Sequence, residues 1–405
     1  MKIGIIVRVI QRGGIPKIAI NETKGLIQNG LKAELVIYRW GNQPHQLQDI
    51  FTSITARSFD KGFLRHIAAF FAKFTLVLLP IGRGLESSVD ISTIILAPTF
   101  FSKKDYDFLL CHDQLAGISG LIAGKKGIPY FTFVHEPLFV AFPLGAMKIS
   151  KYRILSKIVG SIIYSIEKKV LINSAGIFFN SKKTENWVKT CFPSIKGKTK
   201  VIYPGCNPTE RLPEEREEFI LAVSRWDIAK YPTFILDLAE RLDANFVIAG
   251  AWTPQSLLND FINEINNRRL DEKVKVLIDL SEKDVKSLFL RAKMYIHWIP
   301  EGFSMGVLEA MAHGLPVITT RRAGASEIIT NGVDGFIVEK PGASFIDEET
   351  DLDGYVRIIN LLLKNPNLCK SVGKNAWETS KKYSWQEHTK QLLNLVYDKL
   401  NERSS

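Results

Sequence analysis

The sequence predicts an α/β protein made of two doubly wound, parallel-sheet domains in tandem. Short apolar runs alternate with amphipathic helical patterns along nearly the whole chain, which is typical of βαβ units. The length of 405 residues allows two domains of roughly 200 residues each. Hydrophobic residues make up 46% of the chain and charged residues 23%, which excludes a wholly disordered protein and a multi-span membrane protein.

The first domain is expected to begin with a strand. Arg8 interrupts the first apolar run, and Gln11-Arg12 follows where a signal peptide would have small residues, so we interpret the run as a strand. Helical patterns separate it from further apolar runs. We expect the strands of this half at 2–9, 33–39, 107–111, 130–134, 175–179 and 199–203.

The second domain repeats this alternation after a segment that breaks it. Prolines interrupt the periodicity between 203 and 218, where a Glu-rich patch also replaces the preceding lysines, so we place the linker there. We predict a domain at 1–205, a domain at 206–384 and a C-terminal helix at 385–405 that returns to the first domain. Strands are expected at 219–223, 245–249, 274–278, 294–297, 317–319 and 335–338, and helices at 351–364, 366–382 and 385–402.

The net charge of +11 is unevenly distributed along the chain. Residues 1–200 carry +16 and residues 201–405 carry −5. The basic half predicts an anionic partner, which the sign alone leaves open between a phosphate group, an acidic lipid surface and a nucleic acid. The cysteines are widely spaced and form no C-x-x-C pair, so we expect no zinc knuckle, no disulfide framework and a reducing, cytoplasmic compartment.

The strongest functional signal is a strand–turn–helix motif in the second half. Glu301 lies in the turn after the expected strand at 294–297, and Gly314-Leu315-Pro316 ends the helix that follows. Glu309 leans back toward the same cavity and can accept hydrogen bonds from sugar hydroxyls. The alternative is that Glu301 balances the helix dipole and Glu309 lies on the surface. Free amides at the helix start suit a diphosphate, and they belong to Ser304, Met305, Gly306 and Val307.

A second signal is a pair of cations after the strand at 219–223. Arg225 and Lys230 lie in the loop at the carboxyl end of that strand, in an otherwise acidic domain. Ligands of open parallel sheets bind at this edge, so the two cations indicate a pyrophosphate held by charge-assisted hydrogen bonds. The alternative is a surface pair, or an ion pair with Asp227. Both motifs place the expected chemistry in a cleft between the domains.

These motifs resemble those of the retaining family-four glycosyltransferases of GT-B fold. The family's usual forms are G-R-L-x-x-x-K-G and E-G-F-G-x-x-x-x-E-A-M-A-x-G-x-P-V. The likeness extends to Arg12-Gly13-Gly14 after the first strand, His135 after the strand at 130–134, and Tyr203-Pro204-Gly205 at the junction. The sequence departs from the family at three of its glycines, where it has Ser224, Tyr231 and Ser304.

The resemblance implies a role for each matching residue. Arg225 and Lys230 would hold the diphosphate of a UDP- or GDP-linked sugar, and the amides of 304–307 would complete that site. Glu301 and His135 would contact the transferred sugar, and Glu309 would bind the ribose. The remaining matches are Gly13 and Gly14, which would let the backbone of the first domain approach the donor.

No metal or resident cofactor is expected. Fixed cations and helix-terminal amides stabilise the charge that develops on the departing diphosphate, so the transfer does not require a metal ion. Asp105-Tyr106-Asp107 and Asp351-Leu352-Asp353 mimic the D-x-D metal motif of the other major glycosyltransferase fold. The first precedes a strand, on the wrong edge of its sheet for a ligand, and the second opens a helix.

The acceptor side is predicted from the first half. His112 and Glu136 follow strands and are candidates for contacting an acceptor, although a histidine in such a place is also a common polar residue at the edge of a core. Residues 61–80 and 148–170 are apolar and basic, and each is either an ordinary helix or an interfacial one. We expect this domain to dock on the cytoplasmic face of an anionic membrane and to take a lipid-linked glycan or polysaccharide precursor.

Three other functions are open at this point. The enzyme could transfer sugar to a soluble acceptor, or it could be a nucleotide-sugar 2-epimerase, which shares the two-domain fold. A nucleic-acid-binding protein would explain the basic half, but aromatic residues do not interleave with the basic ones in an RNA-binding pattern, so no nucleic acid is expected.

Overall fold

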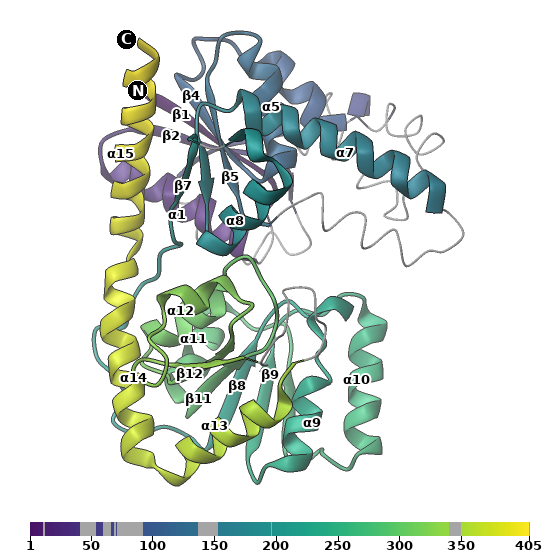
Figure 1. Ribbon diagram of the computed structural model, residues 1–405, viewed down its shortest axis with the longest axis vertical. Helices are drawn as coiled ribbons and strands as arrows, with labels where there is room; N and C mark the ends of the chain where they lie inside the picture. The colour runs from purple at the N-terminus through teal and green to yellow at the C-terminus, as the bar shows by residue number, and fades with distance from the viewer. Residues whose placement is uncertain are drawn as a thin grey trace. The chain divides into compact units, whose positions relative to one another are not determined.

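A computed structural model of the protein describes residues 1–10, 13–40, 54–59, 66–68, 70, 92–136, 153–195, 197–339 and 350–404. These residues form two compact units, Met1–Pro204 together with Trp385–Ser405, and Gly205–Ser384. Each unit is built on one parallel sheet with helices on both of its faces (Figure 1). The predicted class of two doubly wound α/β domains is confirmed.

The first sheet has seven strands in the order β3-β2-β1-β4-β5-β6-β7, and every neighbouring pair is parallel. The order reverses direction between β1 and β4, so the carboxyl ends of these two strands flank the crevice where doubly wound sheets bind ligands. The strands are β1 (Lys2–Ile10), β2 (Lys32–Trp40), β3 (Thr55–Ser58), β4 (Phe108–His112), β5 (Tyr130–Val134), β6 (Ile177–Phe179) and β7 (Thr199–Val201).

Strand β3 was not predicted from the sequence. Its four residues, Thr-Ala-Arg-Ser, have no apolar alternation and are largely exposed, because β3 is the edge strand of the sheet. An edge strand is held by its backbone pairing with β2 and needs no apolar face of its own. The periodicity of apolar residues, on which the other strands were predicted, is therefore absent here.

The two faces of the first sheet pack against different helices. Ile3, Ile5 and Val7 of β1 lie in one apolar core with residues of α1 and α15, whereas Ile6 lies in a second core with residues of α5. This division follows from the alternation of side chains along a strand. The longer helices among the described residues of this unit are α1 (Gly14–Gln28), α5 (Gln114–Gly124), α7 (Arg153–Asn173), α8 (Lys182–Cys191) and α15 (Trp385–Ser404), with 3-10 turns η2 (Ala97–Phe100) and η4 (Pro193–Ile195).

The second sheet repeats the topology with six parallel strands, in the order β10-β9-β8-β11-β12-β13. The reversal lies between β8 and β11. These are the strands that lead into the two motifs found in the sequence. The strands are β8 (Phe219–Val223), β9 (Asn245–Ala249), β10 (Val274–Leu277), β11 (Met294–His297), β12 (Val317–Thr320) and β13 (Phe336–Val338).

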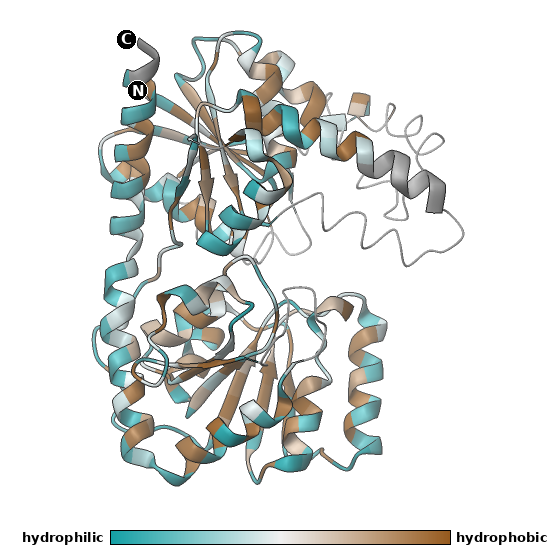
Figure 2. Cartoon of the chain, viewed as in Figure 1, coloured by the Kyte–Doolittle hydropathy of each residue, from teal (hydrophilic) through white to brown (hydrophobic). Residues whose placement is uncertain are grey.

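The strands of this second sheet are almost wholly apolar, and its helices expose polar faces (Figure 2). Helices α9, α10 and α13 contribute to one large core that also contains Trp226 and Trp298. The helices are α9 (Phe234–Arg241), α10 (Gln255–Asn267), α11 (Glu282–Arg291), α12 (Met305–Ala312), α13 (Leu352–Lys364) and α14 (Pro366–Ser380), with 3-10 turns η5 (Ile228–Lys230), η6 (Gly324–Ile328) and η7 (Lys381–Tyr383).

Two further predictions concern the basic, apolar segments of the first half. The segment 61–80 lies outside the described residues except for 66–68, which are helical, and 70. The segment 148–170 contains most of α7, whose side chains are described from residue 161 onward. Among the described helices none has both the length and the apolarity that crossing a membrane requires.

Candidate active site

The two motifs of the second unit meet at the carboxyl ends of β8 and β11. Lys230 closes the short turn η5 after β8, and its ammonium group forms an ion pair with the carboxylate of Glu301, which follows β11. Each side chain is 18% exposed. The indole of Trp298 also donates to the carbonyls of Lys230 and Tyr231, at 3.2 and 3.1 Å. The loops that carry the predicted cation and the predicted acid are therefore fixed to each other.

Arg225 lies at the start of the same loop and is exposed. Its neighbour Trp226 is buried, and the Trp226 indole donates to the carbonyl of Ala249 at 2.9 Å, which anchors the loop to the end of β9. Asp227 accepts from the amide of Ala229 at 3.0 Å, so it caps η5 instead of pairing with either cation. Within the described residues Arg225 has no ion-pair or hydrogen-bond partner, which leaves its guanidinium available to an anionic ligand.

Two of the three departures from the family glycines occur at left-handed backbone positions. Tyr231 has φ 47° and Ser304 has φ 83°, a region that favours glycine because a Cβ crowds the backbone there. The loop shape that glycine allows is thus kept, although other residues occupy both positions. Ser224 is not at a positive φ.

The helix α12 begins directly after Ser304, and its first amides belong to Met305, Gly306 and Val307. A Cβ at Gly306 would lie 2.3 Å from the hydroxyl of Tyr295, so only glycine lets the helix start pack this closely on the end of β11. The Tyr295 hydroxyl donates to the carbonyl of Val223 at 3.1 Å, which ties β11 to the end of β8. The start of α12 is thereby placed beside the loop that carries the two cations.

Glu309 lies one turn further along α12 and is half-buried. Burial raises the pKa of Tyr295, and the negative charge of Glu309 raises it further, so the carboxylate and the phenol are near each other. Glu309 therefore lies near the Tyr295 hydroxyl, which packs against the start of α12.

His297 is a neighbour of the site that the sequence did not single out. It ends β11, is fully buried, and its Nε2 lies 3.5 Å from the Glu301 carboxylate without a hydrogen bond. Burial, together with the nearby charge of Lys230, lowers the pKa of His297 to about 3. The ring is therefore neutral at ordinary pH, and its contact with Glu301 is not an ion pair. A polar residue inside an apolar strand was the signal available in the sequence.

The matching residues of the first unit follow β1 and β5. Gly13 precedes α1, and a Cβ there would meet its nearest neighbour, Pro16, only at 3.9 Å, so internal packing does not require a glycine. Gly14 is the first residue of the helix and is exposed. His135 follows β5, is 4% exposed, and stacks on Phe133 with ring centroids 4.7 Å apart.

The two acceptor-side candidates differ in exposure. Glu136 is exposed, and its backbone carbonyl accepts from Gln114 Nε2 at 2.9 Å. His112 is completely buried and hydrogen-bonded through both ring nitrogens, to Glu22 and to His135. The expectation that His112 contacts an acceptor is therefore corrected: it is a partner of His135 inside the core.

Aspartates of the two D-x-D sequences accept hydrogen bonds within the fold. Asp105 accepts from Ser102, and Asp107 accepts from the amide of Lys2 at the opposite edge of the sheet from His112. Asp351 caps α13 by accepting from Gly354. Among the described residues no group of three His, Cys, Asp or Glu side chains is arranged to hold a metal ion.

Comparison with known protein families identifies the chain. The model of the glycosyl transferases group 1 matches residues 207–379, and the model of glycosyltransferase family 4 matches residues 12–210. The chain belongs to the group 1 glycosyltransferases. The two matches together include both motifs of the second unit and the His135 segment of the first.

Known relatives of this glycosyltransferase agree in fold and class. It is 28% identical to an uncharacterised glycosyltransferase of Methanocaldococcus jannaschii, over 74% of this chain and 87% of the relative. It is 26% identical to a probable sucrose-phosphate synthase of Thermosipho melanesiensis, over 73% of this chain and 71% of that one. The crystal structure of Anabaena HepE in complex with UDP and glucose shares the GT-B fold, with a TM-score of 0.71 and 18% identity over 98% of this chain and 100% of the other.

Proposed function

We propose that this glycosyltransferase moves a hexose-type sugar from a UDP- or GDP-linked donor to a hydroxyl of a lipid-linked glycan or polysaccharide precursor, with retention of configuration and without a metal ion. The observation that carries the proposal is the contact between Lys230 and Glu301, which joins the loop that we assign to the diphosphate to the loop that we assign to the sugar. A relative of the same fold binds UDP and glucose, which supports a nucleotide sugar as the donor.

The diphosphate is assigned to the loop after β8 and to the start of α12. Arg225 is exposed and accessible to the ligand, and Lys230 supplies a second cation from the end of η5. The amides of Met305, Gly306 and Val307 have no partner within the helix because they form its first turn. Together these groups provide two charges and a positive helix end for one pyrophosphate.

The sugar and the ribose are assigned to carboxylates and a histidine. Glu301 accepts hydrogen bonds from hydroxyls of the transferred sugar while it holds Lys230 in place. His135 is assigned to a hydroxyl of the transferred sugar, and Gly13 and Gly14 are assigned to the approach of the backbone to the donor. Glu309 binds the ribose hydroxyls.

The chemistry follows from these assignments. The bond between the anomeric carbon and the diphosphate oxygen breaks, and a bond from that carbon to the acceptor oxygen forms. The acceptor proton passes to the departing diphosphate. Arg225, Lys230 and the helix amides bind the diphosphate more strongly as its charge develops, which lowers the barrier. A front-face displacement accounts for retention because no carboxylate is assigned as a nucleophile.

A donor screen tests the assignment. We expect a matching nucleotide sugar to raise the melting temperature of the protein, and the Arg225→Ala and Lys230→Ala variants to lose most of that rise. Arg241→Ala is the control, since Arg241 is an exposed cation of the same unit that pairs with Asp353. Equal rises in all of these proteins would contradict the diphosphate site. Mass spectrometry of the product identifies the sugar, and an epimerised donor without transfer would indicate an isomerase instead.

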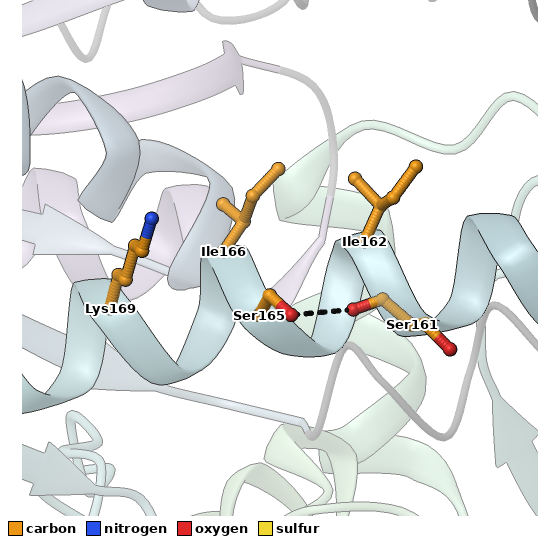
Figure 3. A pocket seen from close by; sticks show the side chains of 5 residues that line it. All are labelled: Ser161, Ile162, Ser165, Ile166 and Lys169. Atoms are coloured by element: carbon orange, nitrogen blue, oxygen red, sulfur yellow. Dashed lines mark hydrogen bonds between the residues drawn. The ribbon is translucent and has the colours of Figure 1, made fainter.

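The membrane part of the proposal is supported by charge and by the exposed face of α7. The first 200 residues carry +16. Ile162 and Ile166 are 51% and 39% exposed, and Lys168 and Lys169 are exposed on the same helix. A shallow hollow of about 500 Å³ is lined by Ser161, Ile162, Ser165, Ile166 and Lys169 (Figure 3). Apolar side chains flanked by lysines are typical of a helix that lies on an anionic bilayer.

Flotation with liposomes that contain acidic lipid tests this surface. The intact protein is expected to float with the vesicles at low salt and to dissociate at high salt, because the attraction is electrostatic. Replacing Ile162 and Ile166 by Ser should reduce flotation, whereas Ile262→Ser, at an isoleucine 40% exposed on α10, should not. Failure of the intact protein to float at low salt would refute the membrane proposal and leave the donor site untouched.

A further inference from the structure

Four buried polar side chains form a hydrogen-bonded chain inside the first unit. Glu22 of α1 accepts from His112 Nε2 at 2.7 Å and from His388 Nε2, on α15, at 2.8 Å. His112 Nδ1 lies 3.0 Å from His135 Nε2. None of the four residues is more than 4% exposed. No role in the proposed reaction has been given to Glu22 or His388.

The hydrogen-bond partners of His388 determine the protonation state of its ring. Burial by itself raises the pKa of Glu22, but the hydrogen bonds from His112 and His388 and the positive charge beside the carboxylate lower it below its usual value, so the group is an ionised carboxylate that only accepts. The other nitrogen of His388, Nδ1, lies 2.7 Å from the carbonyl oxygen of Tyr203, which also only accepts. Both nitrogens therefore carry protons, and His388 is an imidazolium that balances the buried charge of Glu22.

The protonation of His112 and His135 then follows from that of His388. His112 donates from Nε2 to Glu22, whose charge His388 already balances, so a second proton on His112 would be an uncompensated buried charge. His112 Nδ1 is thus an acceptor, and His135 must donate to it from Nε2. This leaves His135 Nδ1 with a lone pair. Within the described residues that nitrogen makes no hydrogen bond, and stacking on Phe133 fixes the plane of the ring.

We propose that Glu22 and His388 are positioning residues that fix the tautomer of His135, so that its Nδ1 accepts a hydrogen bond from a hydroxyl of the transferred sugar. The part that concerns the sugar rests on the function proposed above. Burial lowers the pKa of His135, which keeps its ring neutral. An acceptor of this kind selects a sugar with a hydroxyl at that position and repels one with a carboxylate there.

The tautomer can be measured without substrate. In protein labelled with nitrogen-15 at histidine, long-range proton–nitrogen NMR spectra distinguish the two ring nitrogens, and single His→Gln variants assign the signals. We expect His135 to be neutral with its proton on Nε2, and His388 to carry protons on both nitrogens. A proton on Nδ1 of His135 in the intact protein would overturn the proposal, whether or not the enzyme transfers sugar.

The Glu22→Gln variant tests the consequence for the reaction. His112 and His388 contact different oxygens of Glu22. In glutamine one of these oxygens is replaced by an NH2 group, which donates, so one histidine loses its acceptor and the tautomer of His135 is no longer fixed. We expect kcat to fall by about tenfold or more, because the hydrogen bond between the sugar hydroxyl and His135 is lost. The rise in melting temperature that the nucleoside diphosphate alone produces should stay unchanged. Glu34→Gln is the control, because Glu34 is a half-buried carboxylate of the same unit that binds only the Tyr106 hydroxyl among the described residues.

The outcomes separate the two proposals. A changed His135 signal with a normal kcat in Glu22→Gln would show that the tautomer is set as inferred but that His135 does not act on the sugar. An unchanged signal would refute the positioning role. If Glu22→Gln does not fold, His388→Gln removes the compensating charge from the other side, and the spectrum of the intact protein still decides the assignment.

Discussion

At the scale of single residues, the candidate site is defined by a few side chains whose backbone is unusual. Tyr231 directly follows Lys230, Ser304 follows Glu301 in the next loop, and both residues have a positive φ. Their placement shows why the corresponding family positions are glycines: the loops must turn there, whatever residue is present. The left-handed region costs a residue with a Cβ about 1–2 kcal/mol.

Replacing Tyr231 by glycine tests this explanation. Tyr231 is 57% exposed, so its side chain contributes little packing. We expect Tyr231→Gly to increase the free energy of unfolding by about 1 kcal/mol, because it removes strain, and to leave transfer unaffected. Tyr231→Ala is the control: it removes the same ring but keeps the Cβ. A denaturant titration that finds glycine no better than alanine would contradict the argument.

Replacing Lys230 tests the assigned chemistry. We expect Lys230→Ala to lower kcat/KM by about a hundredfold or more, because a cation that stabilises the departing diphosphate is typically worth about 3 kcal/mol. Arg225→Ala and Glu309→Ala should also abolish most of the transfer. Circular dichroism checks that the fold is intact, and Arg241→Ala serves as the matched surface control. Turnover near normal in Lys230→Ala would contradict the diphosphate assignment.

At the scale of elements, helix ends in the second unit are joined by one partly buried cation. Arg216 donates to the carbonyls of Phe289, Leu290 and Ala292 at 3.1 Å, at the end of α11. It also donates to the carbonyls of His313 and Gly314 at 2.6 and 3.0 Å, just after α12. Burial lowers the pKa of Arg216 to about 10, so the group remains charged at neutral pH. This contact helps to fix the position of α12, and hence of the helix start to which we assign the diphosphate.

Replacing Arg216 is therefore expected to destabilise the protein. Arg216→Ala leaves several helix-terminal carbonyls without a donor and should reduce the free energy of unfolding by about 3 kcal/mol. Arg211→Ala is the matched control, since Arg211 lies in the same segment and forms a fully solvated pair with Glu214, which should contribute less than about 0.5 kcal/mol. Chemical denaturation of both variants measures the difference, and equal losses would show that Arg216 has no special role.

At the scale of the whole molecule, buried neutral histidines make stability depend on pH. The pKa of His297 falls from 6.5 to about 3 on folding. Below pH 6.5 the unfolded chain therefore binds a proton that the folded one does not. The stability contributed by the neutral ring is complete above pH 6.5 and is lost progressively as the pH falls toward 3.

Melting curves at pH 7.5, 6.5 and 5.5 check this dependence. Below pH 6.5 we expect the melting temperature to fall by roughly 3 °C per pH unit for each such histidine. His297→Gln should show a shallower dependence than the intact protein. His66→Gln, at an exposed histidine, should match the intact protein. A melting temperature that rises as the pH falls below 6.5 would contradict this explanation.

Much of the fold was predictable because it depends on local patterns. Apolar strands bounded by turns identified both sheets, and the exception was β3, whose polar residues carry no such pattern. The site was predictable to the extent that its residues follow strands. Arg225, Lys230 and Glu301 come after neighbouring strands β8 and β11, so a parallel sheet brings them together. His297 and Arg216 were missed because their roles depend on burial and on contacts with distant carbonyls.

The sequence by itself determined the class of the protein, the order of its strands along the chain and the loops to which we assign its chemistry, because periodicity and motif spacing are properties of neighbouring residues. Only the tertiary structure decided which distant side chains meet. Glu22 and His388 are 366 positions apart, and nothing near either one in the sequence indicates the other. Their contact exists because α1 and α15 pack on the same face of the first sheet, which places a carboxylate and an imidazole where water cannot reach them, and each becomes the partner that the other requires.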